Sequence, residues 1–477
     1  FSTEQVMLAL SLLSYRGFWK AGSGSQQKLK PSTSAGLEDI AAFNGEWKLV
    51  WGPGTYRYLG SVFDSSMMYI VQNRTTPSQF AVVVRGTNPI ALSDWVFGDF
   101  LAHRQVPWQY GDTTVAPGAK VSLSTALGLK ILVNMKASCD GRQLSDRKNF
   151  DFLFDRSGDI PSEGQQDAIF ACQQPDASDI TKNHQKNLNK LISRLPEYRA
   201  MLRTTAANAE KLSYRLGSYL PIDEMISIFP VRRALIKLLD ASLDTYSGTP
   251  VDILMSDNEI RSEKKNRIGL LEFLGNISEK YGQKLELFVT GHSKGGALAP
   301  VLALFLQDTQ NPRINLPAHY RWNTKHRAKI HCYSFAAPTP GNTHFAHYLN
   351  KHLGKFYYRY SNPYDWACNG WISEDFRKTA GIYGDQVEPV PGMEELVNEI
   401  ADDMEPLDYC HPGRDYRVWN KLRRTTEKHI ISIDGAINPA IKSFMQQWIY
   451  QHVEAYLNGL GMQETVSLNS LIGVDFD

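Results

Sequence analysis

The sequence predicts an α/β fold in which helices cover both faces of a largely parallel sheet. From about residue 259 onward, helical and strand-like segments alternate, which is typical of parallel strands joined by helices. The segment Gln79–Val84 is apolar almost throughout, as expected of a strand that is buried on both faces. A chain of 477 residues, 42% of them hydrophobic, is also long enough to bury the large core of such a fold.

The first part of the chain contains one expected helix and two expected strands. A helix is expected over Thr3–Arg16, where a short apolar run forms one helix face. Strands are expected over Met67–Gln72 and Gln79–Val84, and the loop Arg85–Ser93 follows the second strand. The rest of the first 60 residues is rich in Gly, Ser and Lys and is expected to be loop.

The middle of the chain has a different character. Residues 140–178 are polar and rich in Gly, Pro and Asp, so surface loop is expected there. Two helices are expected next, over Lys182–Leu216 and Val231–Leu243. The second has an apolar face at helical spacing, made by Val231, Leu235, Leu238 and Leu239. Such a face either packs on the core or covers a site.

The second half supplies the alternating elements. Strands are expected over Leu285–Thr290, Lys329–Ser334 and Phe356–Tyr360. The expected helices are Glu259–Tyr281, Ser293–Gln307 and His344–His352. Pro300 lies inside the second of these helices, where its missing amide costs about 3 kcal/mol unless a kink accommodates it.

Charge and composition exclude several classes of protein. The chain has 51 Lys and Arg against 50 Asp and Glu, so nucleic acid is not an expected partner. Its five cysteines show no metal-type spacing, and no metal or cofactor is expected. No apolar run is long enough for a membrane span. The numbering starts at Phe1, which fits a processed or truncated chain, so secretion stays as open as a cytoplasmic location.

The clearest motif is the segment Val289–Gly296, which reads VTGHSKGG and contains G-x-S-x-G between an expected strand and an expected helix. Gly291 and Gly295 permit a turn so sharp that larger side chains would clash. The turn presents the hydroxyl of Ser293 at a helix N-terminus, whose dipole favours developing negative charge. The motif therefore predicts a nucleophilic serine in an α/β-hydrolase; a glycine-rich turn without catalysis is the alternative.

A nucleophilic serine needs a base and an acid, which follow it in the order Ser, Asp or Glu, His in this fold. Asp365 is the candidate acid because it comes soon after the strand Phe356–Tyr360, although an aspartate near proline is also common in turns. Three of the 12 histidines follow it, namely His411, His429 and His452. His429 lies in a strand-like run and is expected to be structural, which leaves His411 and His452 as equal candidates.

The site also needs an oxyanion hole, which stabilises the charge that develops on the substrate carbonyl. One amide is expected from Lys294, the residue after the nucleophile, and the other from a loop after an early strand. Thr87, in the loop after Gln79–Val84, fits the second position. Taken alone, the sequence of this loop is better explained as an ordinary strand-end turn.

These blocks together resemble the class 3 lipases, the fungal-lipase-like branch of the α/β-hydrolases. Residues 82–87, followed by Asp94-Trp95, are similar to the family's oxyanion strand, and Val289–Gly296 is similar to its V-T-G-H-S-x-G-G elbow. Phe335–Asn342 resembles the G-x-P-x-x-G-N block, with Ala336 in place of the first glycine.

The resemblance implies roles for particular residues. It places Asp365 at the catalytic acid and His452, with Tyr456 four residues later, at the catalytic histidine, whereas His411 falls in a segment whose histidine is not catalytic. The implied site is therefore Ser293, Asp365 and His452, with the oxyanion amides of Thr87 and Lys294.

Three departures from the family pattern are evident. Lys294 replaces an apolar residue and would place a long cation at the mouth of the site. The family's H-x-G-F segment is replaced near residues 121–125. Thr87 and Ser293 are also much farther apart than usual, which predicts a cap or lid inserted at residues 137–257 between a first core part, 1–136, and a second core part, 258–477.

The resemblance implies hydrolysis of carboxylic esters, such as triacylglycerol at a lipid–water interface, through an acyl-enzyme on Ser293. A phospholipase A1 or an acyltransferase would use the same three catalytic residues. A hydrolase-like binding scaffold without catalysis is the alternative from another class. Neither head-group preference nor oligomeric state follows from the sequence.

Overall fold

A computed structural model gives the fold. It describes residues 1–18, 25–57, 64–88, 101–112, 117–139, 267–323, 328–418 and 439–473, with isolated residues around 191–200, 233–241, 325 and 422. The expected loop at 140–178 and most of the two helices expected in 182–243 lie outside this part of the chain. The division into 1–136, 137–257 and 258–477 therefore stays a prediction.

A seven-stranded sheet in the order β1-β2-β3-β8-β9-β10-β11 forms the centre of the structure. The last five strands in this order are parallel to their neighbours, while β1, β2 and β3 pair in antiparallel fashion. The largely parallel sheet predicted from the sequence is thus confirmed. The strands are β1 (Trp47–Tyr56), β2 (Ser66–Asn73), β3 (Gln79–Val84), β8 (Glu286–His292), β9 (Lys329–Phe335), β10 (Tyr357–Ser361) and β11 (Arg414–Arg417).

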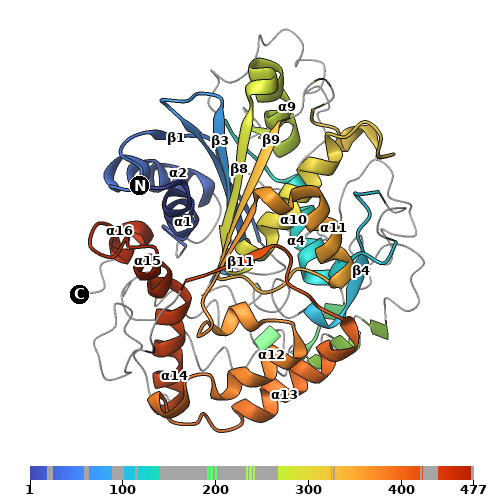
Figure 1. Cartoon of the computed structure of the whole chain (residues 1–477), viewed down its shortest axis with the longest axis vertical. Helices are drawn as coiled ribbons and strands as arrows, with labels where there is room; N and C mark the ends of the chain where they lie inside the picture. The colour runs from blue at the N-terminus through green and yellow to red at the C-terminus, as the bar shows by residue number, and fades with distance from the viewer. Residues whose placement is uncertain are drawn as a thin grey trace.

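Helices cover both faces of the sheet (Figure 1). One face carries α1 (Thr3–Leu13) and α2 (Ser25–Asp39), with the C-terminal helices α15 (Ala455–Gly459) and α16 (Leu468–Ile472) beside them. The opposite face carries α4 (Leu123–Asn134), α10 (Lys294–Thr309) and α11 (Thr343–Leu353). Alternate residues of β3 accordingly belong to two different apolar clusters, Val82 and Val84 to one and Ala81 and Val83 to the other, which explains the continuous apolar run of this strand.

The remaining elements lie around this three-layer core. A further group of helices gathers at one end of the sheet, namely α12 (Ser373–Arg377), α13 (Met393–Met404) and α14 (Pro439–Ile449) (Figure 1). Helix α9 (Leu270–Tyr281) precedes β8. Two small two-stranded sheets pair β4 (Gln105–Pro107) with β5 (Lys120–Ser122) and β6 (Lys136–Ser138) with β7 (Arg267–Gly269). No helix in the described ranges is both long enough and apolar enough to cross a bilayer.

Two expectations from the sequence are wrong. The helix expected over Glu259–Tyr281 begins only at Leu270, because Arg267–Gly269 pairs with residues 136–138 as strand β7. The expectation that most of residues 17–60 are loop also fails, since α2 and β1 lie there. Gly52, Pro53 and Gly54 interrupt the apolar pattern of β1, and the pairing with β2 shifts register around them, so the sequence signal for a strand is weak.

Pro300 is accommodated inside α10 by a neighbouring strand. A proline cannot donate a hydrogen bond to the carbonyl four residues earlier, which here belongs to Gly296. The hydroxyl of Ser334, on β9, donates to this carbonyl instead, at 2.7 Å. The buried carbonyl therefore keeps a partner, and α10 continues without interruption to Thr309.

Several described residues of the expected cap contact the core. Ile192 is fully buried in the core cluster, and Leu238 packs against the same cluster, as expected if the apolar helix face covers the core. Asp240 pairs with Arg104 at 2.9 Å, and Arg233 pairs with Glu399 of α13. Val231, Leu235 and Leu239, which share the expected apolar face, lie outside the residues that the structure describes.

Candidate active site

Ser293 lies at the turn between β8 and α10, as the motif predicts. Its backbone has φ 61° and ψ −130°, a conformation that L-residues rarely adopt and that costs about 1–3 kcal/mol. The amide of Ser293 donates to the carbonyl of Phe335 at 2.9 Å, so β9 supports the strained residue. The side chain of Ser293 is partly exposed, in contrast to the buried residues on both sides of it.

The two glycines of the motif are required by close approach of backbone atoms. A Cβ atom at Gly291 would lie 2.2 Å from the carbonyl oxygen of Gly295, and one at Gly295 would lie 2.3 Å from that of Val84. Both distances are far below any normal contact, so a larger residue at either position would force strand and helix apart. The sharp strand-to-helix turn predicted from G-x-S-x-G is therefore present.

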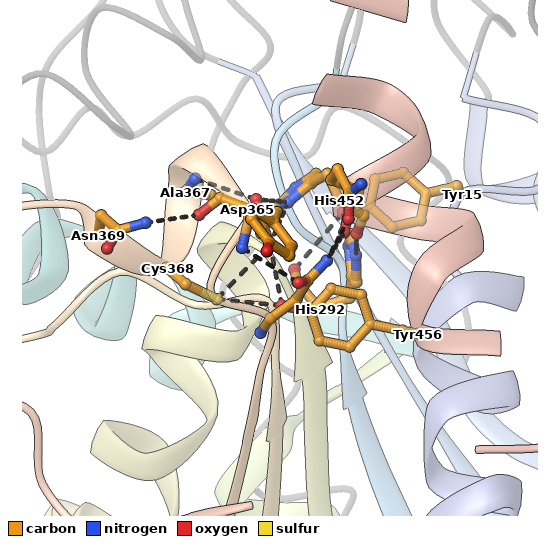
Figure 2. A network of polar contacts seen from close by, with 11 residues as sticks. Tyr15, His292, Asp365, Ala367, Cys368, Asn369, His452 and Tyr456 are labelled. Carbon is orange, nitrogen blue, oxygen red and sulfur yellow. Dashed lines mark hydrogen bonds and ion pairs between the residues drawn. The ribbon is translucent and has the colours of Figure 1, made fainter. Parts of the chain in front are cut away.

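Asp365 and His452 form a buried pair beside this turn (Figure 2). Nδ1 of His452 lies 2.9 Å from each carboxylate oxygen of Asp365. An ionised carboxylate can only accept, so Nδ1 carries the proton and Nε2 is left with a free lone pair. Asp365 also accepts from the amide of Ala367 at 3.0 Å and from the hydroxyl of Tyr456 at 2.9 Å. These donors fix the carboxylate in one orientation.

His411 does not contact Asp365. Its Nε2 donates to the carbonyl of Cys368 at 2.9 Å, and burial lowers the pKa of the ring to about 3, with a further contribution from Arg359. A neutral ring bound to a backbone carbonyl fits a structural histidine. The structure thus brings His452, and not His411, to the candidate acid; His429 lies outside the described residues.

The lowered pKa of His411 predicts a specific pH dependence of stability. Between about pH 6.5 and 3 the unfolded chain binds a proton at this histidine and the folded chain does not, so the free energy of unfolding falls as the pH falls, by at most about 1.4 kcal/mol per pH unit. We expect His411→Gln to make this slope shallower in urea titrations at about pH 7, 6 and 5. Equal slopes for the variant and the wild type would contradict a neutral His411 in the folded chain.

Ser293 and His452 lie on segments that contact each other, but the two residues are not hydrogen bonded. Among the described residues, no hydrogen bond joins the hydroxyl of Ser293 to His452. The ring of His292, directly before Ser293, lies 4.6 Å from the ring of His452 between centroids, which places the imidazole against the nucleophile turn. In enzymes without bound substrate such catalytic hydrogen bonds are often long and tighten only when the substrate binds.

The loop after β3 lies directly against the nucleophile turn. A Cβ atom at Gly86 would lie 2.9 Å from Cβ of Ser293 and 2.4 Å from the carbonyl oxygen of His292. The same loop is also anchored to residue 64, because the side chains of Arg85 and Asn88 both donate to the carbonyl of Asp64. Thr87, between these anchors, is buried. The residue directly before Thr87 therefore lies against Ser293, and the role of Thr87 in an oxyanion hole stays a prediction.

Lys294 differs from the expectation of a cation at the mouth of the site. Its side chain is only 5% exposed, and Nζ lies 3.5 Å from the carbonyl oxygen of Ser65. The long side chain therefore turns into the protein, and only the backbone amide of Lys294 remains next to Ser293.

Gly86 offers a direct test of this loop. We expect Gly86→Ala to lower kcat/KM for ester hydrolysis by about 10²–10³-fold, the effect of losing one oxyanion donor, because the added methyl displaces the loop from Ser293. Gly381→Ala is the matched control, since a Cβ atom there meets nothing within 4 Å. Steady-state kinetics on a soluble ester, with thermal unfolding of both variants, would check this; wild-type activity of Gly86→Ala would contradict the assigned loop.

The hydrogen-bonded network contains residues for which no role was predicted from the sequence. Tyr15 contacts His292, and Asn362 contacts the helix that carries His452 (Figure 2 labels Tyr15, His292 and His452). Asn362 comes soon after an expected strand and precedes Asp365 by three residues. This position at a strand end is a sequence signal by which it could have been found. Tyr15 is 277 residues away from His292 in the sequence, and no motif around it points to a role in the site.

The sheet order, the covering helices and the serine turn define an α/β-hydrolase. Comparison with known families adds that residues 244–369 match the model for lipase (class 3), which confirms the resemblance over this segment. At the level of the family, this match supports an enzyme that hydrolyses lipid esters. No curated protein matches the chain.

A solved structure supports the fold. M37 lipase is similar with a TM-score of 0.57 at 22% identity, over 100% of this chain and 97% of that protein. Lipase II from Rhizopus niveus has a TM-score of 0.31 at 12% identity, over 87% of this chain and 78% of that protein, which is too distant to support a comparison of folds. The likeness to M37 lipase concerns the fold alone.

Proposed function

We propose that the chain is a serine hydrolase that cleaves lipid esters through an acyl-enzyme on Ser293. The observation that carries this proposal is the buried pair of Asp365 and His452 against the strained turn of Ser293. A strained serine at a helix N-terminus, beside a histidine whose Nδ1 is bound to a carboxylate, is the arrangement that activates a hydroxyl for attack.

The proposed reaction uses each residue in one role. Nε2 of His452 removes the proton of Ser293 as the hydroxyl attacks the ester carbonyl, while Asp365 stabilises the imidazolium that forms. The amides of Thr87 and Lys294 stabilise the oxyanion. His452 then passes the proton to the departing alcohol, and it activates the water that releases the fatty acid from Ser293.

Lipid esters are the proposed substrates because the matched family consists of lipases. The proposal is tested by incubating the purified chain with emulsified triacylglycerol and with phospholipid, and by identifying the products. We expect free fatty acid from triacylglycerol. Release of fatty acid from phospholipid alone would favour a phospholipase A1, and an ester with an added alcohol as the main product would favour an acyltransferase.

A binding scaffold without catalysis is the alternative from another class. A fluorophosphonate probe distinguishes it, because such probes react only with activated serines. We expect covalent labelling at Ser293 and none in Ser293→Ala. Absence of labelling in the wild-type chain, together with no hydrolysis of any ester, would favour the scaffold.

A further inference from the structure

His452 lies in an unusual stretch of helix. Residues Tyr450–Glu454 form a π-helical turn between α14 and α15, and His452 is the middle residue of this turn. π-Helical turns are rare and occur frequently at functional sites, because one extra residue in the turn disturbs the regular hydrogen bonds of the helix. Backbone carbonyls in such a turn become available to donors from outside the helix.

Two buried side chains donate to the carbonyls of this turn. Nδ2 of Asn362 lies 3.0 Å from the carbonyl oxygen of Gln451 and 2.7 Å from its Oε1. Nε2 of His292 lies 2.7 Å from the carbonyl oxygen of His452 itself. Asn362 precedes the candidate acid by three residues, and His292 directly precedes the nucleophile. The turn that carries the candidate base is thus hydrogen-bonded to two other segments. One leads to the candidate acid, and the other leads to the candidate nucleophile.

The protonation of His292 follows from its partners. A backbone carbonyl only accepts, so Nε2 carries the proton and donates to His452. Nδ1 is then an acceptor, and the hydroxyl of Tyr15 donates to it at 3.0 Å. Burial lowers the pKa of His292 well below its usual value, and the neighbouring His452 lowers it further. The ring is therefore neutral, which avoids a second cation beside the imidazolium that His452 forms during the reaction.

We propose that His292 and Asn362 are positioning residues that hold the π-helical turn against the nucleophile turn and the acid loop, and so set the direction of the His452 imidazole. This inference rests on the proposed function, since it assigns the device that aligns the proposed base. Tyr15 supports it by fixing the tautomer of His292. The hydrogen bonds of His292 and Asn362 go to the backbone carbonyls of residues 452 and 451, and none of those that the structure describes reaches the hydroxyl of Ser293 or the ring of His452.

A purely structural role makes a different prediction. If the two side chains only stabilise the fold, their loss reduces the fraction of intact protein but leaves each intact site at its normal rate. If they position His452, the rate per intact site falls, because a misplacement of about 1 Å can cost about 10²-fold in rate. The end point of fluorophosphonate labelling counts intact sites, and its rate constant reports how well Ser293 is activated.

The experiment compares His292→Leu, which removes the donor, with His292→Gln, whose side-chain amide can still donate to the carbonyl of His452. We expect His292→Leu to lower kcat per labelled site and the labelling rate constant about 10–100-fold, with KM for a soluble ester changed by less than about 3-fold. His292→Gln is expected to recover most of the loss. His331→Gln is the matched control, because His331 is a buried histidine of the adjacent strand β9 that binds Glu286 and takes no part in the site.

Asn362→Ala provides a second, independent variant. Both side chains hold the same turn, so we expect the losses in His292→Leu and Asn362→Ala to be non-additive in the double variant. Equal rates per labelled site in His292→Leu, Asn362→Ala and wild type would overturn the inference, as would His292→Gln no better than His292→Leu. Failure of the wild-type chain to be labelled at Ser293 would instead overturn the proposed function, so the two failures are distinguishable.

Discussion

Replacement of Ser293 by alanine is expected to lower kcat for lipid ester hydrolysis by at least about 10⁴-fold. The hydroxyl is the group at this turn that would form the acyl-enzyme. The flanking residues are not expected to substitute for it, because both are buried and their side chains are bonded elsewhere, His292 to the carbonyl of His452 and Lys294 to that of Ser65. A small residual rate is expected, because the oxyanion amides and substrate binding remain.

The variant is expected to fold like the wild type, because the hydroxyl that it lacks forms no hydrogen bond within the described part of the chain. The strained backbone at residue 293 remains in alanine, so stability changes little. Initial rates on emulsified triacylglycerol and on a soluble ester, with thermal unfolding as the control, would check the result. Retention of wild-type turnover on both substrates would refute the proposed mechanism.

Asp365→Asn is expected to lower kcat by about 10⁴-fold with little loss of structure. An asparagine at this position can turn its NH₂ group toward Nδ1 of His452, which then becomes an acceptor. The proton moves to Nε2, and the imidazole loses the lone pair that should accept the proton of Ser293. The side-chain oxygen of asparagine still accepts from Ala367 or Tyr456, so the buried site keeps hydrogen-bond partners.

Asp415→Asn is the matched control for this substitution. Asp415 lies on the neighbouring strand β11 and accepts from Ser361 and Arg359, but it does not contact His452. We expect the control to keep kcat within about 3-fold of wild type, as is usual for residues that touch no reacting group. The two variants are compared on the same soluble ester. An Asp365→Asn enzyme that turns over like wild type would mean that another residue is the acid.

The parts of the fold that the sequence predicted well are those with a strong local signal. β3 has the predicted bounds, and β8 and β9 differ from prediction by one or two residues at their ends, because continuous apolar runs mark strands that are buried on both faces. The serine turn was equally clear, since two glycines at fixed positions around a serine reflect a local steric requirement.

Features that depend on distant contacts could not be predicted from the sequence. The residues alone left His411 and His452 as equal candidates, because what separates them is which one packs against the loop after β10. The π-helical turn around His452 has no distinctive composition. It occurs where side chains from β8 and from the loop after β10 form hydrogen bonds with its backbone carbonyls. β1 was missed for the opposite reason, since its Gly-Pro-Gly segment carries a misleading local signal for a turn.

The contact between Ser334 and the carbonyl of Gly296 limits the order in which these residues can have arisen during evolution. A serine at position 334 is harmless while residue 300 still has an amide, because a carbonyl oxygen can accept two hydrogen bonds. The reverse order would leave a buried carbonyl without a partner in the intermediate form, at a cost of about 1–3 kcal/mol. Ancestral forms of this enzyme with Ser334 but without Pro300 are therefore more accessible than forms with Pro300 alone.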